Sequence, residues 1–230
     1  MSILALALYG SRAREDHSPD SDVDLFAITD ESSYKMIVES NVNIACYPRD
    51  LAAIRARGGD LFILHITQEG KTLFDNTGEL KDLHAKFSYK NSYEIDIRLA
   101  SDLAWFVLDM NSLFKNYTLI NKRIAWCVRT ILIAMSAEAR RPVFSSSQLR
   151  EFSGSEEAYL LIENKDSNQQ GTASIGYLTN FLAKFGRQRP ILSRTPTLQE
   201  YRTYFVGSKN TMGIKTVAAI DGISFSHGYI

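Results

Sequence analysis

Cysteine is nearly absent from this chain, with two residues among 230. Both Cys46 and Cys127 lie inside apolar runs, which is typical of small buried side chains in a reducing compartment. A disulfide scaffold and a structural zinc site are therefore excluded. The chain does not need such crosslinks, because a protein of this length buries roughly 70% of the surface that its unfolded form exposes.

Long hydrophobic runs are also lacking. The longest near the start, Ile3 to Tyr9, is far shorter than the ~20 residues that span a bilayer, and no basic segment of a secretion signal precedes it. The sequence therefore predicts a cytoplasmic protein with no membrane partner.

Neither sign of charge is in excess, since 26 basic side chains balance 26 acidic ones. The halves differ, however: residues 1–90 carry 10 basic and 14 acidic side chains, and residues 91–230 carry 16 and 12. Between Lys184 and Lys215, seven cations are opposed only by Glu200. This stretch is either a solvated basic face or a surface for an anion such as RNA.

Short strand and helix patterns alternate over residues 1–90, which predicts an α/β domain built on a mixed sheet. We expect strands at Ile3–Tyr9, Val23–Ile28, Val42–Tyr47 and Lys71–Phe74, and helices at Ser33–Ser40, Arg49–Arg57 and Asp60–Gln68.

Apolar residues at three- and four-residue steps dominate residues 91–230, which predicts an α-helical bundle domain. We expect one long helix from Tyr93 to about Tyr117 and a central helix at Leu119–Met135. Shorter helices are expected from the Ser145–Ser147 caps to Phe152, at Glu156–Glu163 and at Ile175–Phe185, with no assignment for Gly207–Ile230.

The segment that carries chemistry begins at Gly10-Ser11 and continues to Asp22-Val23-Asp24. Glycine permits a sharp turn and a close approach to a ligand, and the first amides of a following helix suit a phosphate. On a strand, the two carboxylates would share one face ~6.6 Å apart, with Val23 and Leu25 directed into the core. They would repel each other by roughly 2.5 kcal/mol, a cost that a bound divalent cation removes.

Gly10-Ser11, ten intervening residues and then Asp22-x-Asp24 between apolar neighbours resemble the signature of the DNA polymerase β-type nucleotidyltransferase superfamily. The likeness is strongest to its minimal bacterial members and to aminoglycoside nucleotidyltransferases. It includes the Pro19-Asp20-Ser21-Asp22 approach and Gly59-Asp60-Leu61-Phe62, and it covers about residues 1–80. Many members append a helical bundle.

The resemblance implies transfer of a nucleoside monophosphate from a nucleoside triphosphate, with ATP as the first choice, to a hydroxyl acceptor with release of pyrophosphate. Asp22 and Asp24 would be catalytic and would hold Mg²⁺ or Mn²⁺. Gly10, Ser11 and Arg12 would bind the nucleotide. The acceptor would be a small molecule, a protein or RNA.

One position departs from the family pattern. The third metal carboxylate is expected on the strand Val42–Cys46, and Asn43 occupies that metal position. Asparagine offers a carbonyl oxygen but no charge and no proton-accepting capacity. Three outcomes stay open: Glu94 or Asp96 substitutes, the acceptor is activated weakly, or activity is lost.

Two functions from different classes therefore remain. The first is an enzyme, a metal-dependent nucleotidyltransferase. The alternative is a degenerate nucleotidyltransferase fold that binds a nucleotide or a protein partner as a regulatory, antitoxin-like protein. Lys122, Arg123 and Arg129 are further candidates for contacts with a triphosphate, whereas His65, inside an apolar run, is expected to be packed and hydrogen-bonded.

Overall fold

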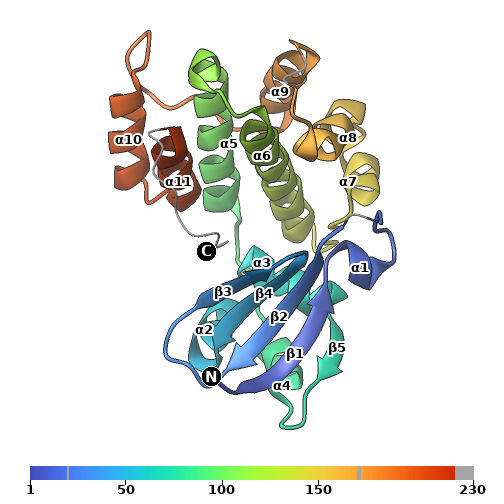
Figure 1. Cartoon of the computed structure of the whole chain (residues 1–230). Helices are drawn as coiled ribbons and strands as arrows, with labels where there is room; N and C mark the ends of the chain where they lie inside the picture. Colours follow the sequence, from blue (N-terminus) through green and yellow to red (C-terminus); the bar gives the residue numbers. More distant parts are fainter. Residues whose placement is uncertain (20, 170–171, 221–230) are drawn as a thin grey trace. The chain divides into compact units, whose positions relative to one another are not determined.

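A computed structural model describes residues 1–19, 21–169 and 172–220 of the chain (Figure 1). Asp20, in the predicted approach to Asp22, lies outside the described residues, as do the last ten residues of the predicted helical domain. The chain divides into two compact units, the first of which comprises Met1–Asn91.

The first unit is built on a mixed five-stranded sheet with the order β3-β4-β2-β1-β5. Strands β2 and β4 are parallel, and all other neighbouring pairs are antiparallel. The strands are β1 (Ile3–Tyr9), β2 (Val23–Thr29), β3 (Lys35–Glu39), β4 (Val42–Pro48) and β5 (Lys71–Phe74). The sheet therefore brings β1, β2 and β4 together at its centre.

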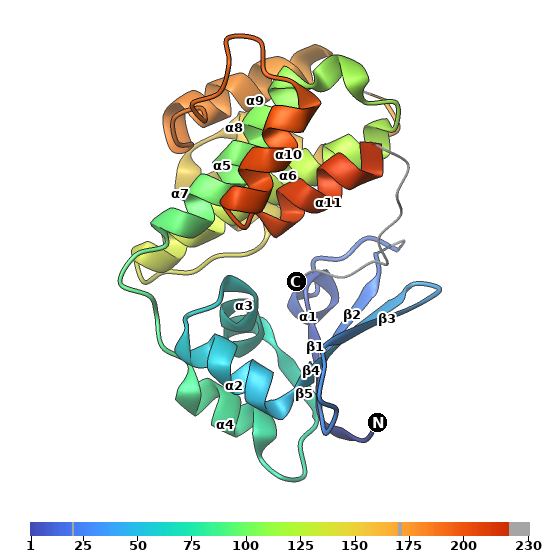
Figure 2. The same ribbon diagram turned by 90° about the vertical axis from the view of Figure 1, so that its left-hand side faces the viewer.

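Three helices cover one face of this sheet, α2 (Arg49–Arg57), α3 (Leu61–Glu69) and α4 (Glu79–Lys86) (Figure 2). The core forms where they meet it, around rows of side chains that cross the strands. One row is Ala7, Phe26 and Ala45, and the next is Ala5, Ile28 and Tyr47. Asp60 begins α3, because its carboxylate accepts hydrogen bonds from the amides of Phe62 and Ile63.

The predicted helix at Ser33–Ser40 is wrong, since these residues contribute the edge strand β3. Glu39 pairs with Val42 across a two-residue turn in which Ser40 adopts φ 52°. Eight residues are too few for a stable isolated helix, and the β-branched pair Ile37-Val38 favours a strand once β4 is available as a partner. Helix α4 was not predicted.

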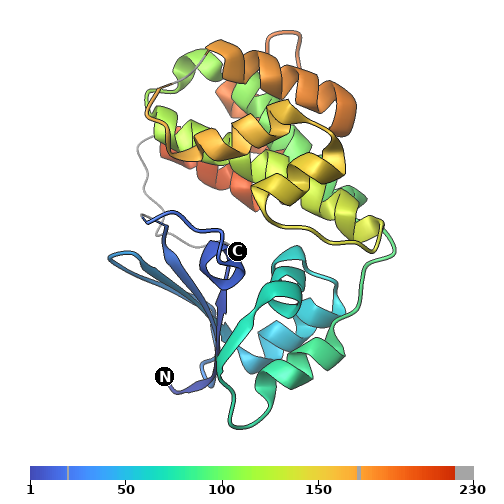
Figure 3. The same cartoon turned by 90° about the vertical axis from the view of Figure 1, so that its right-hand side faces the viewer.

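The second unit, described over residues 92–169 and 172–220, contains helices and no strand in these residues (Figure 3). Its longest helices, α5 (Glu94–Asp109) and α6 (Tyr117–Glu138), pack against each other. The other α-helices are α7 (Ser146–Ser153), α8 (Glu156–Glu163), α9 (Thr172–Phe185), α10 (Leu198–Gly207) and α11 (Thr211–Ile220). The fold class predicted from the sequence, an α/β domain followed by a helical domain, is confirmed.

The single helix predicted from Tyr93 to about Tyr117 is wrong, because α5 ends at Asp109 and a 3-10 turn, Asn111–Leu113, follows. Asn116 then begins α6 by accepting a hydrogen bond from the amide of Leu119. Leu113, Phe114 and Tyr117 continue the three- and four-residue spacing of apolar residues across the break, although Leu113 and Tyr117 are exposed. Helix α10 was missed although Thr197 and Glu200 form a capping box at its start.

None of the helices in the described segments is long and apolar enough to cross a membrane.

Candidate functional site

The Gly10 turn joins β1 to α1 (Ser11–Arg14), a single helical turn. Gly10 adopts φ 75° and ψ −156°, a conformation that is essentially restricted to glycine. The Gly10 carbonyl accepts hydrogen bonds from the amides of Ala13 and Arg14, both at 3.1 Å. The chain thus reverses direction at the end of β1.

Asp24 lies directly beneath this turn. In the β1–β2 pairing it is opposite Tyr9, the residue before Gly10. A Cβ atom added to Gly10 would lie 3.1 Å from Asp24 Oδ2. Any side chain at position 10 would therefore press on the Asp24 carboxylate, so the glycine is required by the turn and by its closeness to Asp24.

Asn43 lies on the other side of Asp24. The parallel register of β2 and β4 places the two residues side by side, and Asn43 Nδ2 donates a hydrogen bond of 3.1 Å to Asp24 Oδ1. The structure therefore brings together Gly10, Asp24 and Asn43, three of the predicted site residues.

Asp22 precedes β2 and is exposed. The guanidinium of Arg12 fixes the backbone there, because Arg12 donates to the Ser21 carbonyl at 2.7 and 3.1 Å and to the Asp22 carbonyl at 3.2 Å. Arg12, predicted to bind nucleotide, here holds the segment that carries Asp22 against α1.

The predicted orientation of the strand is wrong. Asp24 alternates with Phe26 and Ile28, so it shares the face that α2, α3 and α4 cover, and Val23 and Leu25 lie on the opposite face. Both faces of β2 are apolar beyond Asp24, and the sequence alone could not show which one packs against helices. Asp24 therefore lies in the row directly before the core row of Ala7, Phe26 and Ala45.

Asp22, Asp24 and Asn43 carry the side-chain oxygens that could bind a divalent cation at this site. The described residues contain no group of three or more His, Cys, Asp or Glu side chains that could hold a metal ion. Asp22 and Asp24 supply hard carboxylate oxygens, and Asn43 adds an amide beside Asp24. Magnesium is often bound by only one or two carboxylates together with substrate phosphates, so this donor set fits it.

Comparison with known families assigns this unit. Residues 1–79 match the family model described as polymerase beta, nucleotidyltransferase. The N-terminal unit belongs to the polymerase β-type nucleotidyltransferase superfamily. The family model thus covers the sheet and helices α1 to α3 of this nucleotidyltransferase unit, and the helical unit lies outside the match.

A crystal structure of a nucleotidyltransferase-like protein from Exiguobacterium sibiricum 255-15 is 13% identical, with coverage of 96% of this chain and 86% of that chain. The TM-score between the two structures is 0.35. No curated protein matches the sequence.

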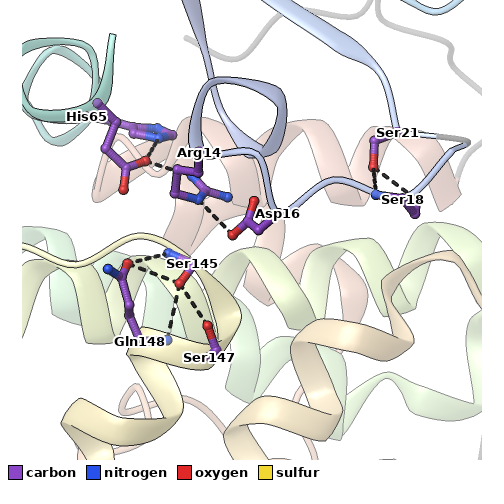
Figure 4. A network of polar contacts seen from close by, with 9 residues as sticks. Arg14, Asp16, Ser18, Ser21, His65, Ser145, Ser147 and Gln148 are labelled. Carbon is purple, nitrogen blue, oxygen red and sulfur yellow. Dashed lines mark hydrogen bonds and ion pairs between the residues drawn. The ribbon is translucent and has the colours of Figure 1, made fainter. Parts of the chain in front are cut away.

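A polar network lies next to the turn in the nucleotidyltransferase unit (Figure 4). Arg14 Nη1 donates to Glu69 Oε2 at 2.7 Å, and Arg14 Nε donates to Asp16 Oδ2 at 3.0 Å. His65 Nε2 lies 2.9 Å from the same Glu69 oxygen. His65 is thus packed and hydrogen-bonded, as expected. The network had no sequence motif, although the i, i+4 spacing of His65 and Glu69 was a usable signal.

The other candidates lie in the helical unit and are engaged there. Glu94 accepts three hydrogen bonds of 2.7–2.9 Å from Arg187, which lower the pKa of its carboxyl group. Lys122 pairs with Asp166. In the basic stretch, Arg187 pairs with Glu94 and Arg189 with Asp109, so part of its charge is neutralised within the unit.

Proposed function

We propose that the protein is a metal-dependent nucleotidyltransferase that moves a nucleoside monophosphate from a nucleoside triphosphate to a hydroxyl acceptor with release of pyrophosphate. One observation carries the proposal: the Asp24 carboxylate lies immediately beneath the glycine turn, where a Gly10 Cβ would be 3.1 Å from Asp24 Oδ2. Phosphates bound at the turn would thus lie next to a carboxylate, an arrangement that favours a shared divalent cation.

Each proposed residue has a distinct part. Asp22 and Asp24 would hold Mg²⁺ or Mn²⁺, which when bound neutralises charge on the transferring phosphate. Gly10 and Ser11 would contact the β- and γ-phosphates, because glycine lets the backbone approach and Ser11 adds a hydroxyl donor. Arg12 would position Asp22 through the two carbonyls that it holds.

We further propose that residues 1–90 are the catalytic domain and residues 91–230 a helical domain, with ATP as the first nucleotide to test. The acceptor hydroxyl would belong to a small molecule, a protein or RNA. Asn43 cannot accept a proton as a carboxylate does. The site therefore depends on an acceptor that is deprotonated by another group or by water.

The test is incubation of the protein with each of four α-labelled ribonucleoside triphosphates and Mg²⁺ or Mn²⁺, with total RNA, cell lysate or an aminoglycoside panel as acceptors. The wild type should move label into one acceptor pool. The double variant Asp22→Asn/Asp24→Asn should move none, because it removes both charges that hold the metal.

A matched control makes the same change of net charge elsewhere in the unit. Asp50 and Asp82 are exposed on α2 and α4. Asp50→Asn/Asp82→Asn should retain wild-type transfer. Equal transfer by the Asp22/Asp24 double variant would contradict the proposed site.

A second function is favoured by Asn43, which gives the site two carboxylates where the resemblance implies three. A degenerate nucleotidyltransferase fold would bind a nucleotide or a partner protein without transfer. Asn43→Asp discriminates between the two, because it places a third carboxylate beside Asp24 in the observed register. Raised transfer indicates an enzyme that lacks one ligand. If neither protein transfers label but both bind triphosphate with metal, the binding module is correct.

A further inference from the structure

Glu69 joins two elements that border the phosphate turn. It is the last residue of α3. Its Oε2 atom accepts a hydrogen bond from the Arg14 guanidinium at the end of α1 and lies 2.9 Å from the His65 ring, one turn earlier in α3. This carboxylate oxygen therefore links α1 to α3 through Arg14 and Glu69, which are 55 residues apart in the sequence.

The side chains of Glu69, Arg14 and His65 are all largely buried. The Glu69 side chain is 15% exposed, and Arg14 and His65 are similarly covered. Burial works against ionisation of Glu69, yet the hydrogen bonds from His65 and Arg14 lower its pKa overall. A buried carboxylate of this kind is costly unless both donors stay in place.

The network continues to the site on the strand side. The His65 ring packs edge-on against Tyr9, with 5.6 Å between ring centroids. Tyr9 is the cross-strand partner of Asp24 and directly precedes Gly10. The His65–Tyr9 contact therefore borders the Gly10 turn on its strand side, and the Arg14–Glu69 ion pair borders it on its helix side.

We propose that Glu69 is a positioning residue for triphosphate binding: through Arg14 and His65 it holds the Gly10–Arg14 turn in the conformation that receives the β- and γ-phosphates. This inference rests on the proposed function for its ligand. Glu69 does not touch the substrate, and it acts by keeping α1 closed over the end of β1.

The chain contains a matched control for this role. Glu79 begins α4, and its side chain is 11% exposed. It accepts a hydrogen bond from Arg49 Nε at 3.0 Å and forms an ion pair with Arg49 Nη2 at 2.6 Å. Glu79→Gln and Glu69→Gln therefore make the same chemical change at similar burial. Only Glu69 borders the turn.

The first measurement is amide hydrogen exchange of the full-length protein, which needs no ligand. The amides of Ala13 and Arg14 donate to the Gly10 carbonyl, so their exchange reports whether the turn is closed. Glu69→Gln should raise exchange at these two amides about tenfold, and Glu79→Gln should leave it unchanged. Unchanged exchange in Glu69→Gln would overturn the proposal.

The second measurement is calorimetric titration with Mg²⁺ and a non-hydrolysable ATP analogue. Glu69→Gln should weaken binding about tenfold, and Glu79→Gln should bind as the wild type does. His65→Leu should also weaken binding, whereas His65→Gln, which keeps a side-chain N–H donor, should restore it. A purely structural role for Glu69 would lower stability in both Gln variants without this difference in affinity.

The two measurements separate the inference from the proposed function. Faster exchange with undiminished affinity overturns the positioning role and leaves the proposed function standing. If exchange is faster in Glu69→Gln but the wild type does not bind the ATP analogue, Glu69 does hold the Gly10–Arg14 turn, and the proposed triphosphate site is contradicted.

Discussion

Replacing Gly10 with alanine tests the link between the turn and Asp24. At φ 75° and ψ −156°, an alanine side chain introduces backbone strain of about 1–3 kcal/mol. Its Cβ would also lie 3.1 Å from Asp24 Oδ2, so the carboxylate must move by a few tenths of an ångström. Alanine restricts the unfolded chain, which returns about 0.4–1 kcal/mol. We expect a net loss of about 1–2 kcal/mol in the free energy of unfolding.

Gly78 provides the comparison, because it also has a positive φ, 79°, but a Cβ there would meet nothing within 4 Å. Gly78→Ala should lower the free energy of unfolding by about 1 kcal/mol or less. This is the strain of an alanine in the left-handed region, partly offset because alanine restricts the unfolded chain. Urea denaturation measures both losses. Nucleotidyl transfer should fall about tenfold or more in Gly10→Ala alone, because small misplacements of reacting groups are costly. Equal stability losses, or wild-type transfer by Gly10→Ala, would refute the reasoning.

Three further changes follow from the contacts. Arg12→Met removes the donors to the Ser21 and Asp22 carbonyls, so metal-dependent triphosphate binding should weaken while the urea midpoint changes little, as calorimetry and denaturation would show. The wild type should be more stable than Glu69→Gln by a constant free energy above the ordinary glutamate pKa of about 4.3. This difference should shrink as the pH falls through the lowered pKa of Glu69 in the folded protein, as denaturation between pH 3 and 7 would show. Tyr204→Phe removes the hydroxyl that donates to the buried Asp102 carboxylate at 2.8 Å. The free energy of unfolding should therefore fall by about 2 kcal/mol at pH 7, and by less when the same change is made in Asp102→Asn.

Most element types in the nucleotidyltransferase unit were predictable, because apolar runs and glycine breaks are local signals. Strands β1, β2, β4 and β5 and helices α2 and α3 lie where the sequence predicts them within one or two residues. The failure at β3 has a physical cause. An eight-residue segment with a central apolar pair satisfies both patterns, and only pairing with β4 decides between them.

In the helical unit, most helices were predictable but the end of α5 was not. The sequence correctly predicted α6, α7, α8 and α9, but the helix predicted from Tyr93 ran through the 3-10 turn after α5, because Leu113, Phe114 and Tyr117 continue its apolar spacing. Helix α10 lacks a strong apolar stripe and was missed, although its Thr197/Glu200 capping box was readable in the sequence.

By itself the sequence determined the residue types that the site can offer: a glycine before a serine, and two aspartates in alternation. These are properties of residue type and short spacing, whereas the third carboxylate expected at Asn43 is implied only by the family resemblance. Only the tertiary structure decided that Asp24 faces the helix-covered side of the sheet, that it touches Asn43, and that Glu69 ties Arg14 to His65. Strand register and helix docking minimise the exposed apolar area of the whole unit, so contacts between residues 19 or 55 positions apart have no counterpart in local spacing.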